Sequence, residues 1–192
     1  GAQLVDDVAP FEAAKLRTLN ASHSLIAYLG CVQGKETVAD AMTEPNIRES
    51  VTGLMQEAEA TFSLPGNFSV SAYQNDLIAR FENRALKHRC EQIAMDGSQK
   101  ILQRIVPIIE WHLKRGSTPH FACRAISAWL AFLRSDAKID DPLADHLLKL
   151  KKGCAKDAVK SLLGMRAIFP AAVGDHHEVR SQVYNELRNQ SD

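Results

Sequence analysis

Apolar residues recur at every third or fourth position through most of the sequence, and runs that alternate apolar with polar residues are nearly absent. One apolar stripe consists of Leu54, Ala58 and Phe62, and another of Ile126, Trp129, Leu130 and Leu133. This spacing places side chains on one face of an α-helix, whereas a half-buried strand requires alternation. We therefore predict an all-α fold, a single domain over residues 1–192 that is long enough to bury a conventional core.

Helix-start signals divide the chain into about eight helical segments. Thr43-Glu44-Pro45, Ser117-Thr118-Pro119 and Asp141-Pro142 each combine a potential capping side chain with a proline suited to a first helical turn. We expect helices over residues 10–30, 44–62, 69–84, 88–114, 119–134, 142–151, 154–164 and 176–189. Pro107 should kink or split the fourth of these helices. Residues 64–68 are expected to form a turn, and residues 164–175 the longest irregular segment.

The charge balance excludes several classes of partner. Because 23 basic residues balance 23 acidic ones, we expect no binding to nucleic acid or to an anionic membrane surface. No apolar run is long enough for a membrane span, and no segment with the features of a signal peptide opens the sequence. The cysteines, Cys31, Cys90, Cys123 and Cys154, lack the CxxC spacing of a zinc site. We therefore expect a cytoplasmic protein with reduced thiols and no metal.

The stretch KLRTLNASHSLIAYLG, residues 15–30, places three polar side chains among the apolar residues of one helix. At about 100° per residue, counted from Lys15, His23 falls at about 80° and Asn20 at about 140°. Leu16 and Leu19 lie on the same arc, so the polar groups interrupt the face that should be buried. Burying such groups without partners costs several kcal/mol. The helix therefore either finds hydrogen-bond partners within the fold or lines a cavity that binds a ligand.

Both possibilities are chemically reasonable. In the structural one, Lys15 extends its amine to solvent, Asn20 caps a neighbouring loop and His23 is a hydrogen-bonded core residue. In the functional one, a lysine in an apolar pocket has a lowered pKa and acts as a base near neutral pH. An asparagine amide can donate to a developing alkoxide, and a histidine can hold the substrate oxygen. Such a trio could oxidise a secondary alcohol without a metal.

The sequence AKLRTLNASHSLIAYLG resembles the K-x-x-x-x-N-x-x-H signature of the mannitol dehydrogenase family, long-chain zinc-independent polyol and uronate reductases. The resemblance implies that Lys15 is the general acid and base. It also implies that Asn20 contributes to an oxyanion hole and that His23 contacts the reacting oxygen.

A second stretch, from Arg80 to Arg104, resembles the substrate-binding segment of that family, whose core is D-G-S-x-K. The resemblance makes Lys100 a residue that contacts the substrate. On a continuous helix Gln92, Asp96, Lys100 and Arg104 would form a ladder along one stripe, which is also typical of a solvated, ion-paired face. Gly97 is unfavourable inside a helix, and we expect it to mark a bend or a close approach of chain or ligand.

Two positions depart from the pattern of the mannitol-type members. These members have an arginine where this chain has Gln92, and the version here looks more like that of the fructuronate reductases (D-mannonate oxidoreductases). A hexuronate substrate brings a carboxylate, which Lys100, Arg104 or Arg89 could bind, and the sequence leaves the choice open. The family also has a proline after the equivalent of Asn83, where this chain has an arginine, which puts the loop geometry in doubt.

The sequence contains no G-x-G-x-x-G motif and no alternation of strands and helices, so it has no recognisable nucleotide site. The resemblance implies that NAD is bound mainly by a preceding Rossmann-type domain absent from this chain, which would then be the C-terminal substrate domain and inactive alone. The implied substrate is a small sugar acid, D-mannonate or D-fructuronate. The alternatives are a polyol (mannitol or arabinitol) 2-dehydrogenase, a tagaturonate reductase, or a non-catalytic helical interaction module.

Two further clusters are assigned no function. His176 and His177 are adjacent, so their side chains would point about 100° apart on a helix and would not share a metal ion. A local basic group is expected to be a solvated helix surface; it consists of Lys149, Lys151, Lys152, Lys156 and Lys160.

Overall fold

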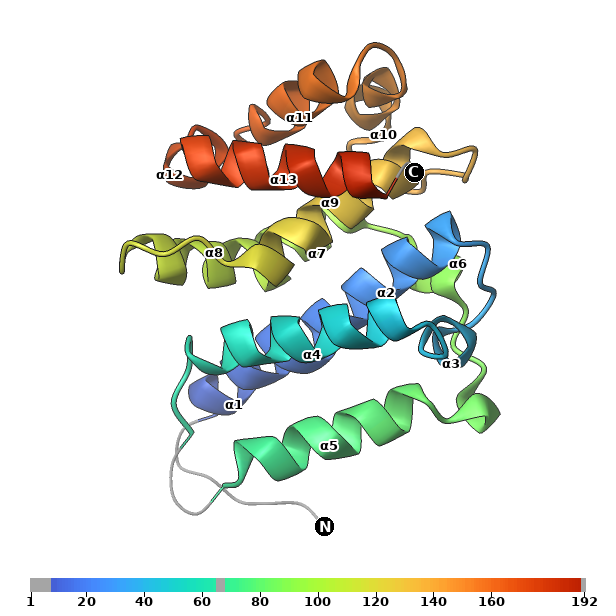
Figure 1. Ribbon diagram of the computed structural model, residues 1–192, viewed down its shortest axis with the longest axis vertical. Coiled ribbons are helices and arrows are strands. Elements are labelled where there is room, and N and C mark those ends of the chain that lie inside the picture. Colours follow the sequence, from blue (N-terminus) through green and yellow to red (C-terminus); the bar gives the residue numbers. More distant parts are fainter. Residues whose placement is uncertain (1–7, 65–67, 191–192) are drawn as a thin grey trace.

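The computed structural model describes residues 8–64 and 68–190 and is built from helices (Figure 1). The first half contains α1 (Ala9–Lys15), a π-helical segment (Leu16–Asn20), α2 (Ala21–Val32), α3 (Val38–Ala41), α4 (Pro45–Glu59), α5 (Val70–Phe81) and a 3-10 turn (Arg84–Leu86). The second half contains α6 (Cys90–Ala94), α7 (Gly97–Arg104), α8 (Val106–Leu113), α9 (His120–Arg134), α10 (Ala144–Leu147), a 3-10 turn (Leu148–Lys151), α11 (Ala155–Leu163), α12 (Ala171–Gly174) and α13 (His177–Asn189). The described residues contain no strand, only an isolated bridge between Thr37 and Arg89, so the prediction of an all-α fold is confirmed.

The helices stack in layers around two central ones, α2 and α9. In Figure 1 α5 lies at one end, followed by α1, α2 and α4, then by α7, α8 and α9, and finally by α13 and α11. Helix α2 packs against α9, α6 and α4, and α9 also packs against α13. Both central helices are rich in small and apolar residues, and every residue from Leu25 to Gly30 is buried. A helix that is apolar on most sides can only be a core helix, which explains the central place of these two.

The surrounding helices each bury one stripe. In α4 the buried side chains include Ile47, Val51, Leu54 and Ala58, at the spacing that one helical face requires. Pro45 stands in the first turn, where its missing amide costs no hydrogen bond. The periodic apolar pattern of the sequence therefore corresponds to real buried faces.

The expected boundaries hold for the regular helices and fail where the backbone is irregular. The predictions 44–62, 69–84, 119–134, 154–164 and 176–189 each match one helix within three residues. The predicted helix 88–114 divides at residue 105, just before Pro107, as predicted, but it also breaks at residues 95–96, so it is wrong as a continuous element up to Pro107. The 142–151 segment divides into α10 and a 3-10 turn, and 164–175 contains α12. Of the expected turn 64–68, residues 65–67 lie outside the described residues.

Of the predicted capping segments, only the one at Asp141 caps the residues that follow it, because the Asp141 carboxylate accepts from the Leu143 amide at 2.8 Å. Thr43 donates to the carbonyl of Asp40, and Thr118 donates to Glu178, so neither caps the helix that follows it. The first amides of α9 are instead capped from α4, because the Glu57 carboxylate accepts from the Phe121 and Ala122 amides at 2.9 and 2.8 Å. A carboxylate at a helix N-terminus satisfies free amides and favours the helix dipole. This cap fixes α9 relative to α4 through a tertiary contact that local sequence does not reveal.

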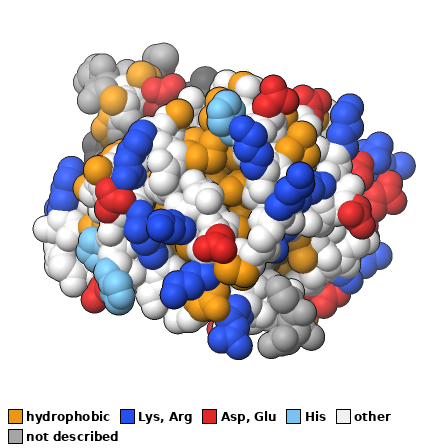
Figure 2. All heavy atoms as spheres, turned by 90° about the horizontal axis from the view of Figure 1, so that it is seen from above, with side chains coloured by type: hydrophobic (Ala, Val, Ile, Leu, Met, Phe, Trp, Pro, Cys, Tyr) orange, Lys and Arg blue, Asp and Glu red, His pale blue; other side chains and the backbone are white. Residues whose placement is uncertain are grey.

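Three further expectations concern membrane helices, the cysteines and the group of lysines near the C-terminal helices. Helices long and apolar enough to cross a membrane are not found in the described part of the chain. All four cysteines are free, and two of them, Cys90 and Cys123, are buried. The face above α11 and α13 shows Lys and Arg side chains dispersed around a central hydrophobic area (Figure 2). Most lysines of the predicted basic group are exposed there, whereas Lys151 donates to the Ser135 carbonyl at 2.6 Å.

Candidate functional site

The helix that carries the K-x-x-x-x-N-x-x-H pattern is not a regular α-helix. Between α1 and α2 it widens into the π-helical segment Leu16–Asn20, in which the Ala21 amide donates to the Leu16 carbonyl, five residues back. The Thr18 hydroxyl donates to the Ala14 carbonyl at 2.5 Å, and the Arg17 guanidinium donates to the Thr61 carbonyl at the end of α4 at 2.6 Å. π-Helical insertions in α-helices are rare and are frequent at functional sites.

The π segment changes which side chains share a face. It accommodates one extra residue in the turn, so residues after it are rotated back by about 100° relative to a continuous α-helix. Around the helix axis, Asn20 then lies about 40° to one side of Lys15, and His23 lies about 20° to the other side. The three side chains therefore fall within roughly 60° of one another, whereas a regular helix would spread them over about 140°.

Lys15 is exposed, as in the structural interpretation in which its amine extends to solvent, and it does not lie in an apolar pocket of the described residues. The helix turns its small residues Ala14, Thr18 and Ala21 into the core instead. Asn20 and His23 are partly buried beside it. The polar stripe thus runs from solvent at Lys15 to the edge of the core at His23, as expected for one open wall of a site.

His23 provides the most unusual polar atom of this stripe. Its ring stands against Phe81 of α5, with centroids 4.7 Å apart, and against His88 at 5.6 Å. Its Nε2 atom is buried and has no hydrogen-bond partner. Burial, reinforced by the nearby charges of His88, Arg80 and Arg104, lowers the pKa of His23 to about 4. The imidazole is therefore neutral near pH 7 and can donate or accept one hydrogen bond through the free nitrogen.

This lowered pKa predicts how stability depends on pH. The pKa of His23 rises from about 4 in the folded protein to about 6.5 in an unfolded chain. Between these two pH values the unfolded chain binds more protons than the folded protein does. The stabilisation is therefore complete above the pKa of His23 in the unfolded chain and is lost as the pH falls toward its pKa in the folded protein. Between about pH 7 and about pH 5 the free energy of unfolding should fall in both proteins. We expect the fall in His23→Leu to be smaller than that in the wild type by about 2 kcal/mol.

Urea denaturation of wild type and His23→Leu at the two pH values measures this difference. The exposed His146 provides the control, because His146→Gln should keep the pH dependence of the wild type. Identical pH dependence in wild type and His23→Leu would show that His23 does not titrate in this way.

The D-G-S-x-K segment begins a new helix instead of continuing α6. Met95 is extended and Asp96 adopts the left-handed conformation at φ 54°, after which α7 begins at Gly97. The Asp141 carboxylate holds this start, accepting from the Ser98 amide and from the Ser98 hydroxyl, both at 2.7 Å. The predicted ladder is therefore wrong, because Gln92 lies in α6, Asp96 is the N-cap of α7, and only Lys100 and Arg104 lie within one helix.

Gly97 marks a close approach of the chain, as the sequence predicted. A β-carbon at this position would lie 2.2 Å from Nε1 of the buried Trp129, far inside van der Waals contact. Only glycine allows α7 to begin against α9 in this way.

Helix α7 connects the two motif segments. Lys100 donates to the Ile93 carbonyl at 3.0 Å, and burial, followed by the charge of Arg104, lowers its pKa. Arg104 reaches in the other direction and donates to the carbonyl of Asn20 at 3.1 Å and to the hydroxyl of Ser24 at 2.9 Å. Segments far apart in the sequence are thus joined at the π segment.

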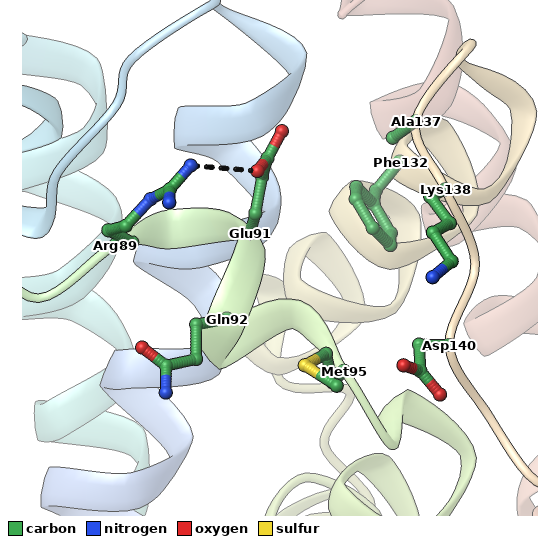
Figure 3. A pocket seen from close by; sticks show the side chains of 8 residues that line it. All are labelled: Arg89, Glu91, Gln92, Met95, Phe132, Ala137, Lys138 and Asp140. Atoms are coloured by element: carbon green, nitrogen blue, oxygen red, sulfur yellow. Dashed lines mark hydrogen bonds and ion pairs between the residues drawn. The ribbon is translucent and has the colours of Figure 1, made fainter.

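Arg89 and Gln92 line a neighbouring cavity of about 370 Å³, between α6, the end of α9 and residues 137–140 (Figure 3). Both side chains are exposed, and the Arg89 guanidinium lies 3.3 Å from the Glu91 carboxylate. Lys15, Asn20 and His23 do not line this cavity. The structure therefore joins Arg104 directly to the helix that carries the K-x-x-x-x-N-x-x-H pattern, whereas Lys100 contacts Ile93 of α6, and Arg89 and Gln92 line the neighbouring cavity.

The chain matches the family described as the mannitol dehydrogenase C-terminal domain over residues 7–190. It belongs to the mannitol dehydrogenase family. D-mannonate oxidoreductase of Escherichia coli is 40% identical over 177 residues, which are 88% of this chain and 36% of that protein. Mannitol 2-dehydrogenase of Phaeosphaeria nodorum is 31% identical over 193 residues, 96% of this chain and 33% of that protein.

A solved structure shares the fold over the full chain. The mannitol 2-dehydrogenase of Pseudomonas fluorescens, in a ternary complex with NAD and D-mannitol, superimposes with a TM-score of 0.93 at 26% identity. The match covers 100% of this chain and 40% of that one. This member of the mannitol dehydrogenase family therefore spans little more than a third of the length of the relatives that it matches.

Several residues of the site could not be found from the family pattern. Ser24, His88 and the backbone carbonyl of Asn20 belong to the contacts around the motif. The spacing of Lys100 and Arg104 placed them one helical turn apart on one face, but it did not indicate that Arg104 contacts Asn20 and Ser24. In the described part of the chain no group of three or more His, Cys, Asp or Glu side chains is placed to bind a metal ion.

Proposed function

We propose that this chain is the substrate domain of an NAD-dependent oxidoreductase that interconverts D-mannonate and D-fructuronate. The observation that carries the proposal is the alignment of Lys15, Asn20 and His23 by the π segment, together with the free, neutral His23 nitrogen beside them. Membership of the mannitol dehydrogenase family and the 40% identity to a D-mannonate oxidoreductase support it.

The chemistry follows from the three side chains. Lys15 takes the proton of the substrate hydroxyl as the carbon loses a hydride, and the C–O bond becomes a carbonyl. Bound NAD supplies the acceptor for that hydride. The Asn20 amide donates to the oxygen while it carries negative charge, and His23 holds the same oxygen through Nε2. In the reductive direction Lys15 returns the proton.

Lys100 is the best placed residue for the substrate carboxylate. It is partly buried, its pKa is lowered by that burial, and an incoming carboxylate would compensate its charge. Arg89 already faces Glu91, and one nitrogen of Arg104 is engaged by Asn20 and Ser24. Gln92 and Asp96 are exposed; the Gln92 amide can donate to or accept from sugar hydroxyls, and the Asp96 carboxylate can accept from them.

The described residues lack the strand, glycine-rich turn and helix that would bind a dinucleotide. We therefore assign NAD binding to another, Rossmann-type domain of the same polypeptide, which would cover Lys15 and complete the cleft. No side chain of the described part is assigned to the cofactor.

A polyol dehydrogenase is the second candidate, because mannitol 2-dehydrogenase of Phaeosphaeria nodorum is also 31% identical. A tagaturonate reductase is a third, which the same side chains would serve. A non-catalytic helical module is the alternative of another class.

The substrate prediction is tested with the full open reading frame that encodes this chain. We expect NADH oxidation to be at least about 10-fold more efficient in kcat/KM with D-fructuronate than with D-fructose, because one charge-assisted hydrogen bond contributes about 1.5–3 kcal/mol. Lys100→Met should abolish this preference, whereas Arg89→Met should preserve it. Preference for D-fructose or D-tagaturonate would assign the protein to another branch, and no turnover of any of the three would favour the interaction module.

A further inference from the structure

Arg104 makes hydrogen bonds within the protein that a residue binding only the substrate would not need. Its Nη1 atom donates to the carbonyl oxygen of Asn20, the last residue of the π segment, and to the hydroxyl of Ser24. The Ser24 hydroxyl itself donates to the same Asn20 carbonyl at 3.2 Å. Three groups therefore meet at the point where the widened turn returns to the regular geometry of α2.

A π turn is rare and departs from regular α-helical geometry, so contacts to its backbone carbonyls favour it over that geometry. At its start Thr18 and Arg17 make the holding contacts, to Ala14 and Thr61. At its end the holding contacts are those of Arg104 and Ser24. Loss of the insertion would rotate Asn20 and His23 by about 100° away from Lys15.

We propose that Arg104 is a positioning residue, whose hydrogen bond to the Asn20 carbonyl holds the π segment and so keeps Lys15, Asn20 and His23 on one face. The inference rests on the proposed function of these three residues. It assigns Arg104 to the geometry of the catalytic helix and not to the carboxylate of the substrate.

The surroundings of Arg104 agree with this role. The side chain is partly buried, and its Nη1 atom is held by the Asn20 carbonyl and the Ser24 hydroxyl. Its helix is anchored at the other end, where Asp141 binds the Ser98 amide and hydroxyl. A rigid α7 therefore presents Arg104 to the π segment at a fixed position, as the support of a catalytic residue requires.

Arg104→Met tests the proposal in the full-length protein, because methionine keeps most of the apolar stem and removes every donor. We expect kcat to fall about 10²-fold, the loss that a displacement of about 1 Å produces, with KM changed much less. The loss should be equal for D-fructuronate and D-fructose, and Arg104→Lys should recover part of it. A carboxylate ligand would instead raise KM for the uronate alone, and that result would overturn the proposal.

Arg134 supplies a matched control. It is also partly buried and donates to two carbonyls, those of Leu150 at 2.6 Å and Gly153 at 3.1 Å, but it lies away from the motif. Arg134→Met should lower stability by a similar amount and leave kcat within about threefold of the wild type. If both variants lose kcat equally, the effect is general destabilisation and the proposal fails.

A readout independent of turnover separates this inference from the proposed function. Amide hydrogen exchange over residues 16–24 should be faster in Arg104→Met than in the wild type and unchanged in Arg134→Met. If Arg104→Met does not fold, Arg104→Gln carries the same comparison. Faster exchange in a protein that turns over none of the substrates would support the role of Arg104 in the helix while refuting the proposed function. Unchanged exchange would overturn the inference whatever the activity.

Discussion

Replacing Lys15 by alanine is expected to lower turnover by about 10³- to 10⁴-fold, the largest effect of any single substitution proposed for this chain. In the proposed mechanism Lys15 accepts and returns the proton of the substrate hydroxyl. Asn20 and His23 would remain and still hold the oxygen, so substrate affinity should change much less than turnover. The fold should hardly respond, because Lys15 is exposed.

The measurement is NADH oxidation by the full-length protein with saturating D-fructuronate, for the wild type and Lys15→Ala. The exposed Lys114, at the end of α8, gives the matched control, since Lys114→Ala removes the same charge outside the site. Activity within about tenfold of the wild type in Lys15→Ala would refute its role as the base, because a positioned acid or base contributes at least about 10²-fold.

The regular part of the fold could be predicted from the sequence because it depends on local patterns. The apolar spacing of α4 and of α13 is enough to define which face each helix buries, and Pro45 defines a start. The K-x-x-x-x-N-x-x-H pattern likewise located the trio without any structure. Each of these features depends on residues within about four helical turns of one another, so the local sequence is enough to predict it.

The features that shape the site depend on residues far apart in the chain and could not be predicted. The π segment is held by Thr61 and Arg104, from the end of α4 and from α7. The break before α7 is held by Asp141, which lies far along the chain, beyond the end of α9. Gly97 indicated a bend near the start of α7, but nothing in the local sequence of Leu16–Asn20 distinguishes a continuous α-helix from the π-helical segment.

Gly97→Ala is expected to lower the free energy of unfolding by about 3 kcal/mol, against the small gain that alanine normally gives in a helix. The added methyl group would lie 2.2 Å from Nε1 and 2.8 Å from Cε2 of Trp129, which is buried and cannot move aside freely. Either Trp129 or the start of α7 must shift. Movement of α7 would displace Lys100 and Arg104 together, so turnover should fall along with stability.

Urea denaturation of Gly97→Ala, Trp129→Phe and the double variant measures the coupling between the two residues. Phenylalanine lacks the indole nitrogen that the new methyl group meets, so the loss in the double variant should be smaller than the sum of the two single losses by about 1 kcal/mol or more. Additive losses would show that the methyl group is accommodated without contact to Trp129. In that case the close approach of Trp129 would not be what requires glycine at position 97.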